Sequence, residues 1–581
     1  MQDLNTLLAQ AITLHQQGQL QQAKTLYEII LSRQSQHIDA LHLLGLIAKE
    51  QGEVNKAIVL ITQSLHLYSN NPVAHTNLGI ILHSQQRYAE SIACYDQALT
   101  IDRHYAEAHY QRGNSLLALQ QPEQAIMEYQ IALALKLNHA NIHCNLGNAL
   151  LDLKDYETAL KSYDMALTLR PNYAEAFSNK GIVLQELGYL EQALACYNQA
   201  IKLKPKYAKA FYNRGNLLSS RREFQTALSD YQAAIDAQPH YAKAIASQGL
   251  ALQSLKRFNQ AIASYDKALA LNHSLDFIMG NRLFMKMNLC DWQDFDNELK
   301  QITEGIKRGE KISSPFVMQS ISDSADLQKQ AAILYAEKYA KQHAPLSKHQ
   351  HTKIKIGYFS SDFRIHPVSQ LLIDVFERHD RTRFEVIAFS FHAAKQKDAT
   401  RLKLEQLFDQ FLDVSQLSDT QIVQLARQLE CDIAVDLNGH TEGCRTNIFA
   451  LRVAPIQVSY IGYLGTMGMD CIDYLIADKI LIPEHHQQHY NEKIVYLPHS
   501  FQANDSQLDI STNTPTRETL GLPEHGFVFC CFNNHYKITP TLFACWLNIL
   551  QQVPNSVLWL LGDNSEAETN LRLTASKQGI A

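Results

Sequence analysis

The stretch CCFNNHYKITP, Cys530 to Pro540, places two amides, an imidazole, a phenol and an ammonium directly after an apolar run. Residues 527–532 have the composition of a buried strand, and the polar residues follow where that strand would end. Amides and ammonium groups donate hydrogen bonds to anions, and an imidazole exchanges a proton near neutral pH. The stretch is therefore a candidate binding loop, although a solvated loop would explain Lys537 equally well.

Similar polar clusters follow other predicted strands. Ser360-Ser361-Asp362-Phe363 precedes His366-Pro367, the sequence DLNGHT occupies residues 436–441, and the glycine-rich loop GYLGTMG occupies residues 462–468. The carboxyl ends of parallel strands meet at one edge of a sheet, where ligands bind. Each cluster alone is as consistent with a simple turn, but together they predict a cleft.

The segments that must hold these loops alternate between strand and helix patterns. We expect strands within residues 353–363, 384–391, 431–441, 456–463 and 474–478, and helices at 369–379 and 419–430. This alternation predicts a parallel, doubly wound α/β lobe over residues 346–505. A second α/β lobe is expected over residues 514–581. So small a sheet would leave an apolar face exposed, so we expect this lobe to be incomplete.

The first half of the chain repeats itself every 34 residues. The pattern is a glycine, a small residue twelve positions later and, in most units, a tyrosine four positions after that. The glycines are Gly45, Gly79, Gly113, Gly147, Gly181, Gly215 and Gly249. Such a period is typical of tetratricopeptide repeats, which are antiparallel helix pairs stacked into a superhelix. We therefore predict eight repeats over residues 4–275, with the tyrosine filling the space between neighbouring pairs, followed by divergent capping helices and a linker over residues 276–345.

An amide recurs two positions before most of these glycines. The residues are Asn77, Gln111, Asn145, Asn179 and Asn213, and the row is broken by Leu43 and Ser247. Asparagine is a mediocre helix former, so its recurrence at one position needs a reason. One interpretation is a ladder of amides that binds the backbone of an extended acceptor peptide. The alternative is polar filler on a solvated face.

Composition excludes several classes of protein. The net charge is −6, and no long basic block indicates a nucleic-acid partner. No apolar stretch is long enough to indicate a membrane span, and the N-terminus does not have the pattern of a signal peptide. The ten cysteines form no CxxC pair, which is typical of reduced thiols in a cytoplasmic protein.

These motifs together resemble the O-linked N-acetylglucosamine transferase family. The matching stretches are CDW at 290–292, IGYFSSDFRIHPVS at 356–369, DLNGHTEGCR at 436–445, ALRVAPIQVSYIGYLGT at 450–466, DYLIAD at 473–478, FCCFNNHYKITP at 529–540 and VPNSVLWLL at 553–561. The resemblance implies tetratricopeptide repeats followed by a two-lobed GT-B glycosyltransferase. It also implies transfer of N-acetylglucosamine from UDP-GlcNAc to Ser or Thr hydroxyls of proteins, with inversion and without a metal or other cofactor.

The resemblance also assigns roles to individual residues. His366 matches a histidine near the sugar and acceptor and is a candidate base, although a helix-capping or structural histidine is the alternative. His440 is the second candidate from its position alone, because it ends a predicted strand beside Asn438 and Thr441. Lys537 matches a lysine that faces the donor diphosphate, with Asn534 and Tyr536 beside it. An ammonium at that place would stabilise charge on the leaving phosphate. The amide ladder of Asn77, Asn145, Asn179 and Asn213 matches the row that guides the acceptor peptide.

The chain also departs from the family pattern. Asn534 stands where the family usually has Gln, Leu464 and Met467 replace Pro and Ser of the glycine loop, and family segments that hold the nucleotide would lie beyond Ala581. Two alternatives therefore stay open: a tetratricopeptide scaffold with a non-catalytic lobe, and the same fold acting on another nucleotide sugar, such as a fucose from a guanosine donor.

Overall fold

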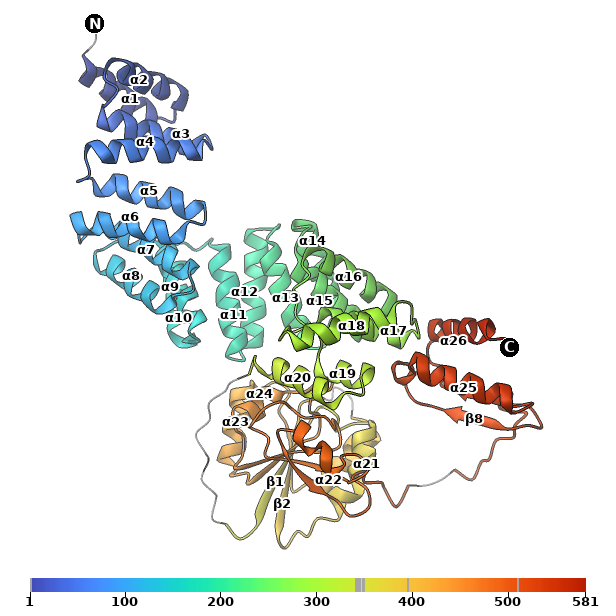
Figure 1. The fold of residues 1–581 in the computed structure, drawn as a ribbon. Coiled ribbons are helices and arrows are strands. Elements are labelled where there is room, and N and C mark those ends of the chain that lie inside the picture. Colours follow the sequence, from blue (N-terminus) through green and yellow to red (C-terminus); the bar gives the residue numbers. More distant parts are fainter. Residues whose placement is uncertain (1–2, 340–345, 347–350, 394–396, 509–510, 581) are drawn as a thin grey trace. The chain divides into compact units, whose positions relative to one another are not determined.

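The computed structural model describes residues 3–339, 346, 351–393, 397–508 and 511–580. The chain forms two compact units, residues 1–213 and 214–581. The described part of the chain begins with sixteen helices, as predicted, and successive helices pack in pairs from α1 with α2 to α11 with α12, and again as α15 with α16 (Figure 1). They are α1 Leu4–Gln16, α2 Leu20–Arg33, α3 Ile38–Glu50, α4 Val54–Leu67, α5 Pro72–Ser84, α6 Tyr88–Ile101, α7 Ala106–Ala118, α8 Pro122–Ala134, α9 Ala140–Asp152, α10 Tyr156–Leu169, α11 Ala174–Glu186, α12 Leu190–Leu203, α13 Ala208–Ser220, α14 Phe224–Ala237, α15 Ala242–Ser254 and α16 Phe258–Leu271.

The recurring glycine and tyrosine pack against each other within one helix pair. A Cβ atom added to Gly147 on α9 would lie 2.7 Å from Cε1 of Tyr163 on α10, so no larger residue fits there without a shift. Our prediction that the tyrosine fills the space between neighbouring pairs is therefore incomplete, because its ring lies against the glycine of its own pair. The Tyr163 hydroxyl then donates to Asn148 on the same glycine-bearing helix, at 2.8 Å.

Four further helices follow the array, as the sequence predicts. They are α17 Ile278–Asn288, α18 Phe295–Lys307, α19 Pro315–Ile321 and α20 Ala325–Ala336. A buried ionic contact ties α17 to α18, because the Lys286 ammonium lies 2.6 Å from the Glu298 carboxylate. Residues 340–345, the end of the predicted range of capping helices and linker, lie outside the described residues, and the predicted domain boundaries stay predictions.

The second unit contains a seven-stranded sheet in which every pair of neighbouring strands is parallel. The strands are β1 Ile354–Ser360, β2 Phe384–Ser390, β3 Gln410–Asp413, β4 Ile433–Asp436, β5 Ile456–Ser459, β6 Tyr474–Ala477 and β7 Lys493–Tyr496. Their order across the sheet is β3-β2-β1-β4-β5-β6-β7. The predicted doubly wound sheet is thus present. Strands β3 and β7 were not predicted, because each is a partly exposed edge strand without a continuous apolar run.

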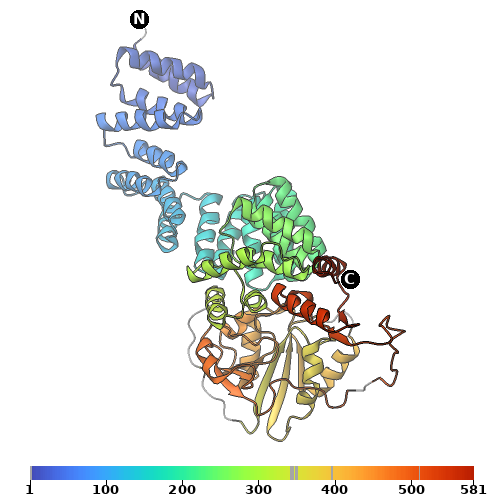
Figure 2. The ribbon, with the colours of Figure 1, turned by 45° about the vertical axis from the view of Figure 1, so that its right-hand side comes forward.

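Helices cover both faces of this sheet (Figures 1 and 2). They are α21 Pro367–Glu377, α22 Ala399–Leu407, α23 Asp419–Gln428 and α24 Thr446–Ala450, and the 3-10 helix η1 spans Glu484–His489. Neighbouring residues of one strand point to opposite faces: Phe359 packs with the α23 and α24 side chains, and Tyr358 packs with α21 and α22. Burial on both faces explains the continuous apolar runs in the sequence.

A second, two-stranded parallel sheet is formed near the C-terminal end of the sequence. Its elements are β8 Val528–Cys531, the 3-10 turn η2 His535–Lys537, α25 Pro540–Gln552, β9 Val557–Leu560 and α26 Ser565–Lys577. Phe543 and Leu547 of α25 pack against Cys290 and Trp292, which follow α17. Phe527 and Phe532 flank β8 and are 57% and 54% exposed, in agreement with the expected apolar face on this small sheet.

None of the described helices is both long enough and apolar enough to span a bilayer. The cytoplasmic location expected from composition stays a prediction.

Candidate active site

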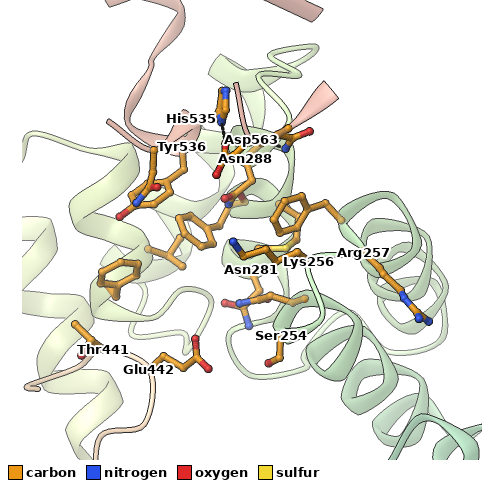
Figure 3. A pocket seen from close by; sticks show the side chains of 18 of the residues that line it. Ser254, Lys256, Arg257, Asn281, Asn288, Thr441, Glu442, His535, Tyr536 and Asp563 are labelled. Atoms are coloured by element: carbon orange, nitrogen blue, oxygen red, sulfur yellow. Dashed lines mark hydrogen bonds and ion pairs between the residues drawn. The ribbon is translucent and has the colours of Figure 1, made fainter. Parts of the chain in front are cut away.

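The second unit holds a cavity of about 1150 Å³ (Figure 3). Its walls come from the turn between α15 and α16, from α17 and α19, and from the loops that follow β1, β4, β8 and β9. The cavity is larger than the roughly 300–1,000 Å³ of most small-molecule sites. Its volume is therefore sufficient for a small-molecule ligand.

The sheet topology explains why the loops after β1 and β4 meet at this cavity. These two strands are neighbours, but the chain leaves β1 toward β2 on one side of the sheet and leaves β4 toward β5 on the other. Such a switch in strand order separates the loops that follow β1 and β4. It opens a crevice at the carboxyl ends of these two strands, where ligands bind. His366 follows β1 and His440 follows β4, and both line the cavity.

Asp362 is the fixed carboxylate of the first loop. It is 6% exposed, and its Oδ2 accepts a hydrogen bond from Asn438 Nδ2 at 2.9 Å, across the switch point. Its Oδ1 accepts from the Ser361 hydroxyl at 3.1 Å. Nη2 of Arg364 lies 3.6 Å from Oδ1. The sequence indicated a polar loop here, but not the hydrogen bonds that join it to the β4 loop.

His366 caps helix α21 while its ring lines the cavity. Its Nδ1 accepts the Val368 N–H at 3.3 Å, and Pro367 occupies the first helical position, where no N–H is needed. Burial lowers the pKa of His366 and Arg364 adds to this, while Asp362 opposes it. The imidazole is therefore neutral near pH 7, as a base must be.

His440 is more deeply enclosed than His366. It is 7% exposed, its ring lies edge-on to Tyr335 and Tyr463, and its Nε2 donates to the Met467 carbonyl at 3.0 Å. Burial lowers the pKa of His440 to about 4, so the ring is neutral. Its Nδ1 is buried and has no hydrogen-bond partner among the described residues. This geometry suits a wall of the site better than a group that touches substrate.

The loop after β8 brings Asn534, His535 and Tyr536 to the cavity. The Tyr536 ring packs 4.9 Å from Phe284 of α17 and 6.0 Å from Phe316 of α19, measured between centroids. Burial raises the pKa of Tyr536. His535 is 6% exposed, and its Nδ1 lies 3.2 Å from Asp563 Oδ1 in the loop after β9 (Figure 3).

Lys537 is placed differently from its neighbours. Its ammonium is exposed, lies 3.3 Å from Asn533 Oδ1, and is not among the described residues that line the cavity. The 3-10 turn explains this, because it has three residues per turn and sends successive side chains in different directions. The diphosphate role of Lys537 stays a prediction.

The turns of the last helical repeats contribute two cations to the cavity that were not predicted from the sequence. Arg222 and Lys256 both line the cavity, and Arg222 forms an ion pair with Glu442 of the β4 loop. The two residues are 34 positions apart, so they occupy the same turn position in successive repeats. Earlier repeats carry Gly52, Gln86, Gln120, Lys154 and Gly188 there, so the repeat register alone does not single out the two cations.

The predicted amide ladder forms hydrogen bonds between successive repeats. Asn145 Nδ2 donates to Asn114 Oδ1 at 2.8 Å, and Asn179 Nδ2 donates to Asn148 Oδ1 at 2.8 Å. In addition, Asn77 Nδ2 lies 3.1 Å from His42 Nε2, and Asn213 Nδ2 donates to Ser178 Oγ at 3.3 Å. These bonds give the ladder a structural role and occupy one of the two N–H groups of Asn145 and of Asn179. Peptide binding by the rest of each amide stays a prediction.

Within the part of the chain that the structure describes, no group of three or more His, Cys, Asp or Glu side chains is arranged to hold a metal ion. The expectation of a metal-free reaction is not tested by this observation.

The second unit combines the last helical repeats with a doubly wound lobe, and its cavity lies at the switch point of the sheet. This is the architecture of a multidomain protein with a candidate ligand site. The sequence matches the description "Glycosyl transferase family 41" over residues 289–514 and 505–581, half of the chain. It matches tetratricopeptide repeats over several ranges between residues 4 and 275. The chain therefore belongs to glycosyl transferase family 41.

Individual relatives agree with this assignment. A probable UDP-N-acetylglucosamine–peptide N-acetylglucosaminyltransferase (SEC) from Arabidopsis thaliana is 41% identical over 233 residues, which cover 39% of this chain and 24% of the relative. A UDP-N-acetylglucosamine–peptide N-acetylglucosaminyltransferase from Caenorhabditis elegans is 26% identical over 424 residues, covering 50% of this chain and 37% of the relative. This chain thus spans well under half the length of either relative.

Among solved structures, an O-GlcNAc transferase mutant from Thermobaculum terrenum is similar to this chain. It is 23% identical, with a TM-score of 0.40, and the match covers 76% of this chain and 72% of that one.

Proposed function

We propose that this chain is a repeat-bearing protein O-glycosyltransferase. It would transfer N-acetylglucosamine from UDP-GlcNAc to Ser or Thr hydroxyls of an acceptor polypeptide, without a metal. The observation that carries the proposal is the cavity in the second unit, where a family 41 lobe and the last helical repeats contribute facing walls. The relatives named above support the choice of donor and acceptor.

In this proposal the two walls have different tasks. The loops after β1 and β8 supply His366 as the candidate base, Asn534 and Tyr536 as donor contacts, and Lys537 as the cation for the leaving diphosphate. Lys537 would have to turn toward the cavity when the donor binds. An acceptor would reach the same cavity along the repeats, with Asn77, Asn145, Asn179 and Asn213 bonding its backbone. Such contacts are independent of the acceptor's sequence, because every peptide carries the same N–H and C=O groups.

The test is a transfer assay on the full chain. UDP-GlcNAc with a labelled sugar is incubated with a library of Ser- and Thr-containing peptides, and the products are read by mass spectrometry. We expect a mass increase of one N-acetylhexosamine on the peptides. GDP-fucose in a parallel reaction distinguishes the other donor class, and product from that donor alone would contradict the choice of sugar.

A second candidate function is a peptide-binding scaffold whose lobe does not catalyse transfer. The position of Lys537 outside the cavity favours it. Calorimetric titration with uridine diphosphate separates the two functions. A scaffold would bind peptides with no measurable affinity for the nucleotide, whereas the transferase binds both.

A further inference from the structure

One nitrogen of His366 lies near two groups of opposite character. Its Nδ1 accepts the Val368 N–H at 3.3 Å and lies 3.8 Å from Asp362 Oδ2. The first neighbour can only donate a hydrogen bond, and the second, when ionised, can only accept one. The same nitrogen therefore has two alternative partners, and the partner determines whether it carries a proton.

The choice of partner decides whether His366 can act as a base. A neutral imidazole carries one proton, on either Nδ1 or Nε2. While Nδ1 accepts from Val368, the proton must be on Nε2, and that nitrogen cannot take a proton from a hydroxyl. When Nδ1–H donates to Asp362 instead, Nε2 carries a lone pair. Only this second tautomer is competent as a base.

Asp362 is well placed to hold that second tautomer. Its carboxylate is buried and fixed by Asn438 and Ser361, so it needs no reorganisation when the ring turns toward it. A hydrogen bond requires the distance between Nδ1 and Oδ2 to shorten by about 1 Å, to the usual range for a charge-assisted pair. Rotation of a side chain that is only partly buried can supply this change, since the His366 side chain is 34% exposed.

We propose that Asp362 is a positioning residue that converts His366 from a helix cap into a base. This inference rests on the proposed function. In the reaction, the acceptor hydroxyl passes its proton to Nε2, and its oxygen forms the bond to the sugar carbon. The bond from that carbon to the diphosphate oxygen breaks, and the diphosphate takes the electron pair. The imidazolium, stabilised by Asp362, then releases the proton to solvent.

Other charged groups surround this pair and stay unchanged in the test. Arg364 lies on the same loop, Asp398 accepts the Ile365 N–H at 3.0 Å from the start of α22, and His392 follows β2. Across the cavity is the ion pair of Arg222 and Glu442. Asp398 serves as the matched control. It is also a carboxylate beside this loop, but it accepts a backbone N–H and does not face the His366 ring.

The central variant is Asp362→Asn in the full chain. Two quantities are followed: the midpoint of the His366 titration by NMR, assigned with His366→Asn, and the pH dependence of peptide transfer. We expect Asp362→Asn to lower the titration midpoint, to move the acid limb of the rate profile to lower pH, and to reduce the plateau rate at least about tenfold. Asp398→Asn should leave the midpoint unchanged. An unchanged midpoint in Asp362→Asn, or a lower plateau with an unmoved acid limb, would overturn the proposal.

A second variant covers the case in which Asp362→Asn does not fold. Val368→Pro removes the competing N–H at the second position of α21, where that N–H has no carbonyl partner within the helix. We expect transfer to be retained or faster, since the cap no longer holds the inactive tautomer. A slower rate in a folded Val368→Pro chain would contradict the mechanism. A shifted His366 midpoint in a chain that transfers nothing would overturn the proposed function and still support the pairing of Asp362 with His366.

Discussion

The repeat array and the cavity of the second unit differ in how often a contact recurs and in how far apart its residues lie in the sequence. In the array one contact recurs in successive pairs, as between Gly147 and Tyr163, and joins residues 16 positions apart. In the cavity the contacts occur once and span long separations, as from Asp362 to Asn438, 76 positions away. The difference teaches that a substitution in the array acts mainly on stability, whereas one in the cavity acts mainly on chemistry.

The largest effect is expected from breaking the array contact. Tyr163→Ala removes a fully buried ring and should lower the free energy of unfolding of the array by about 3–5 kcal/mol. Urea unfolding followed by circular dichroism measures it. The exposed Tyr189, 48% accessible, is the matched control, and its alanine variant should change stability far less. Equal effects of the two substitutions would show that the buried ring does not stabilise the array.

Lys537→Ala, in the loop after β8 that borders the cavity, tests the chemical side of the comparison. We expect peptide transfer to fall at least about 100-fold, or about 3 kcal/mol in the barrier, because an ammonium stabilises charge on the departing diphosphate. Steady-state kinetics measures the loss, and circular dichroism should show an intact fold. Lys577→Ala, at the exposed end of α26, is the control. Undiminished turnover in Lys537→Ala would refute the role.

A pH-dependent effect is expected at Asp436, the last residue of β4. Burial raises the pKa of Asp436 from 3.8 to about 6, against hydrogen bonds from the N–H groups of Asn438 and Gly439. The folded state therefore holds this proton more tightly than the unfolded chain does, and the stabilisation present below pH 3.8 is lost as pH rises to about 6.

Asp436→Asn should remove that loss, because an amide can accept the same two bonds without ionising. Relative to the wild type, the variant should gain stability between about pH 4 and 6, by on the order of 1–3 kcal/mol. Thermal unfolding across this range measures the difference. A difference that does not vary with pH would show that Asp436 does not titrate in this range.

The smallest effect is expected from the amide ladder. Replacing Asn145, Asn179 and Asn213 together with Ala should raise the KM for acceptor more than the KM for donor, since each amide contributes about 1 kcal/mol at most. Each of the three substitutions also removes an inter-repeat hydrogen bond, so the array should be slightly less stable. Asn55→Ala, on the exposed side of α4, is the control. Equal increases in both KM values would contradict the ladder.

Much of the fold was predictable because periodic patterns report local packing. The glycine and tyrosine register predicted the sixteen helices, and the apolar runs predicted the central strands β1, β2 and β4. The edge strands β3 and β7 were missed, since neither is buried on both faces and neither therefore has a continuous apolar run. The sequence spacing does not distinguish a tyrosine that packs within its own helix pair from one that packs between pairs. The prediction of a contact between pairs was therefore incomplete.

The site was only partly predictable. His366 and His440 follow neighbouring strands of the seven-stranded sheet, so its topology brings them to one edge. Asn534 and Tyr536 follow β8 of the separate two-stranded sheet, and all four residues line the cavity. The direction of a side chain on a turn does not follow from topology, which is why Lys537 was expected in the cavity but is not among its lining residues. The pairing of His535 with Asp563 depends on two loops 28 positions apart, and the sequence offered no signal for it.

The most direct test of the account is the transfer rate of His366→Asn in the full chain. Asparagine is a good N-cap, so helix α21 keeps its first hydrogen bond while the imidazole is removed. We predict that the wild-type chain glycosylates peptides from UDP-GlcNAc, and that His366→Asn loses at least about 100-fold in rate with unchanged affinity for the donor. Transfer by His366→Asn at the wild-type rate would contradict the central claim that this cavity is an active site with His366 as its base.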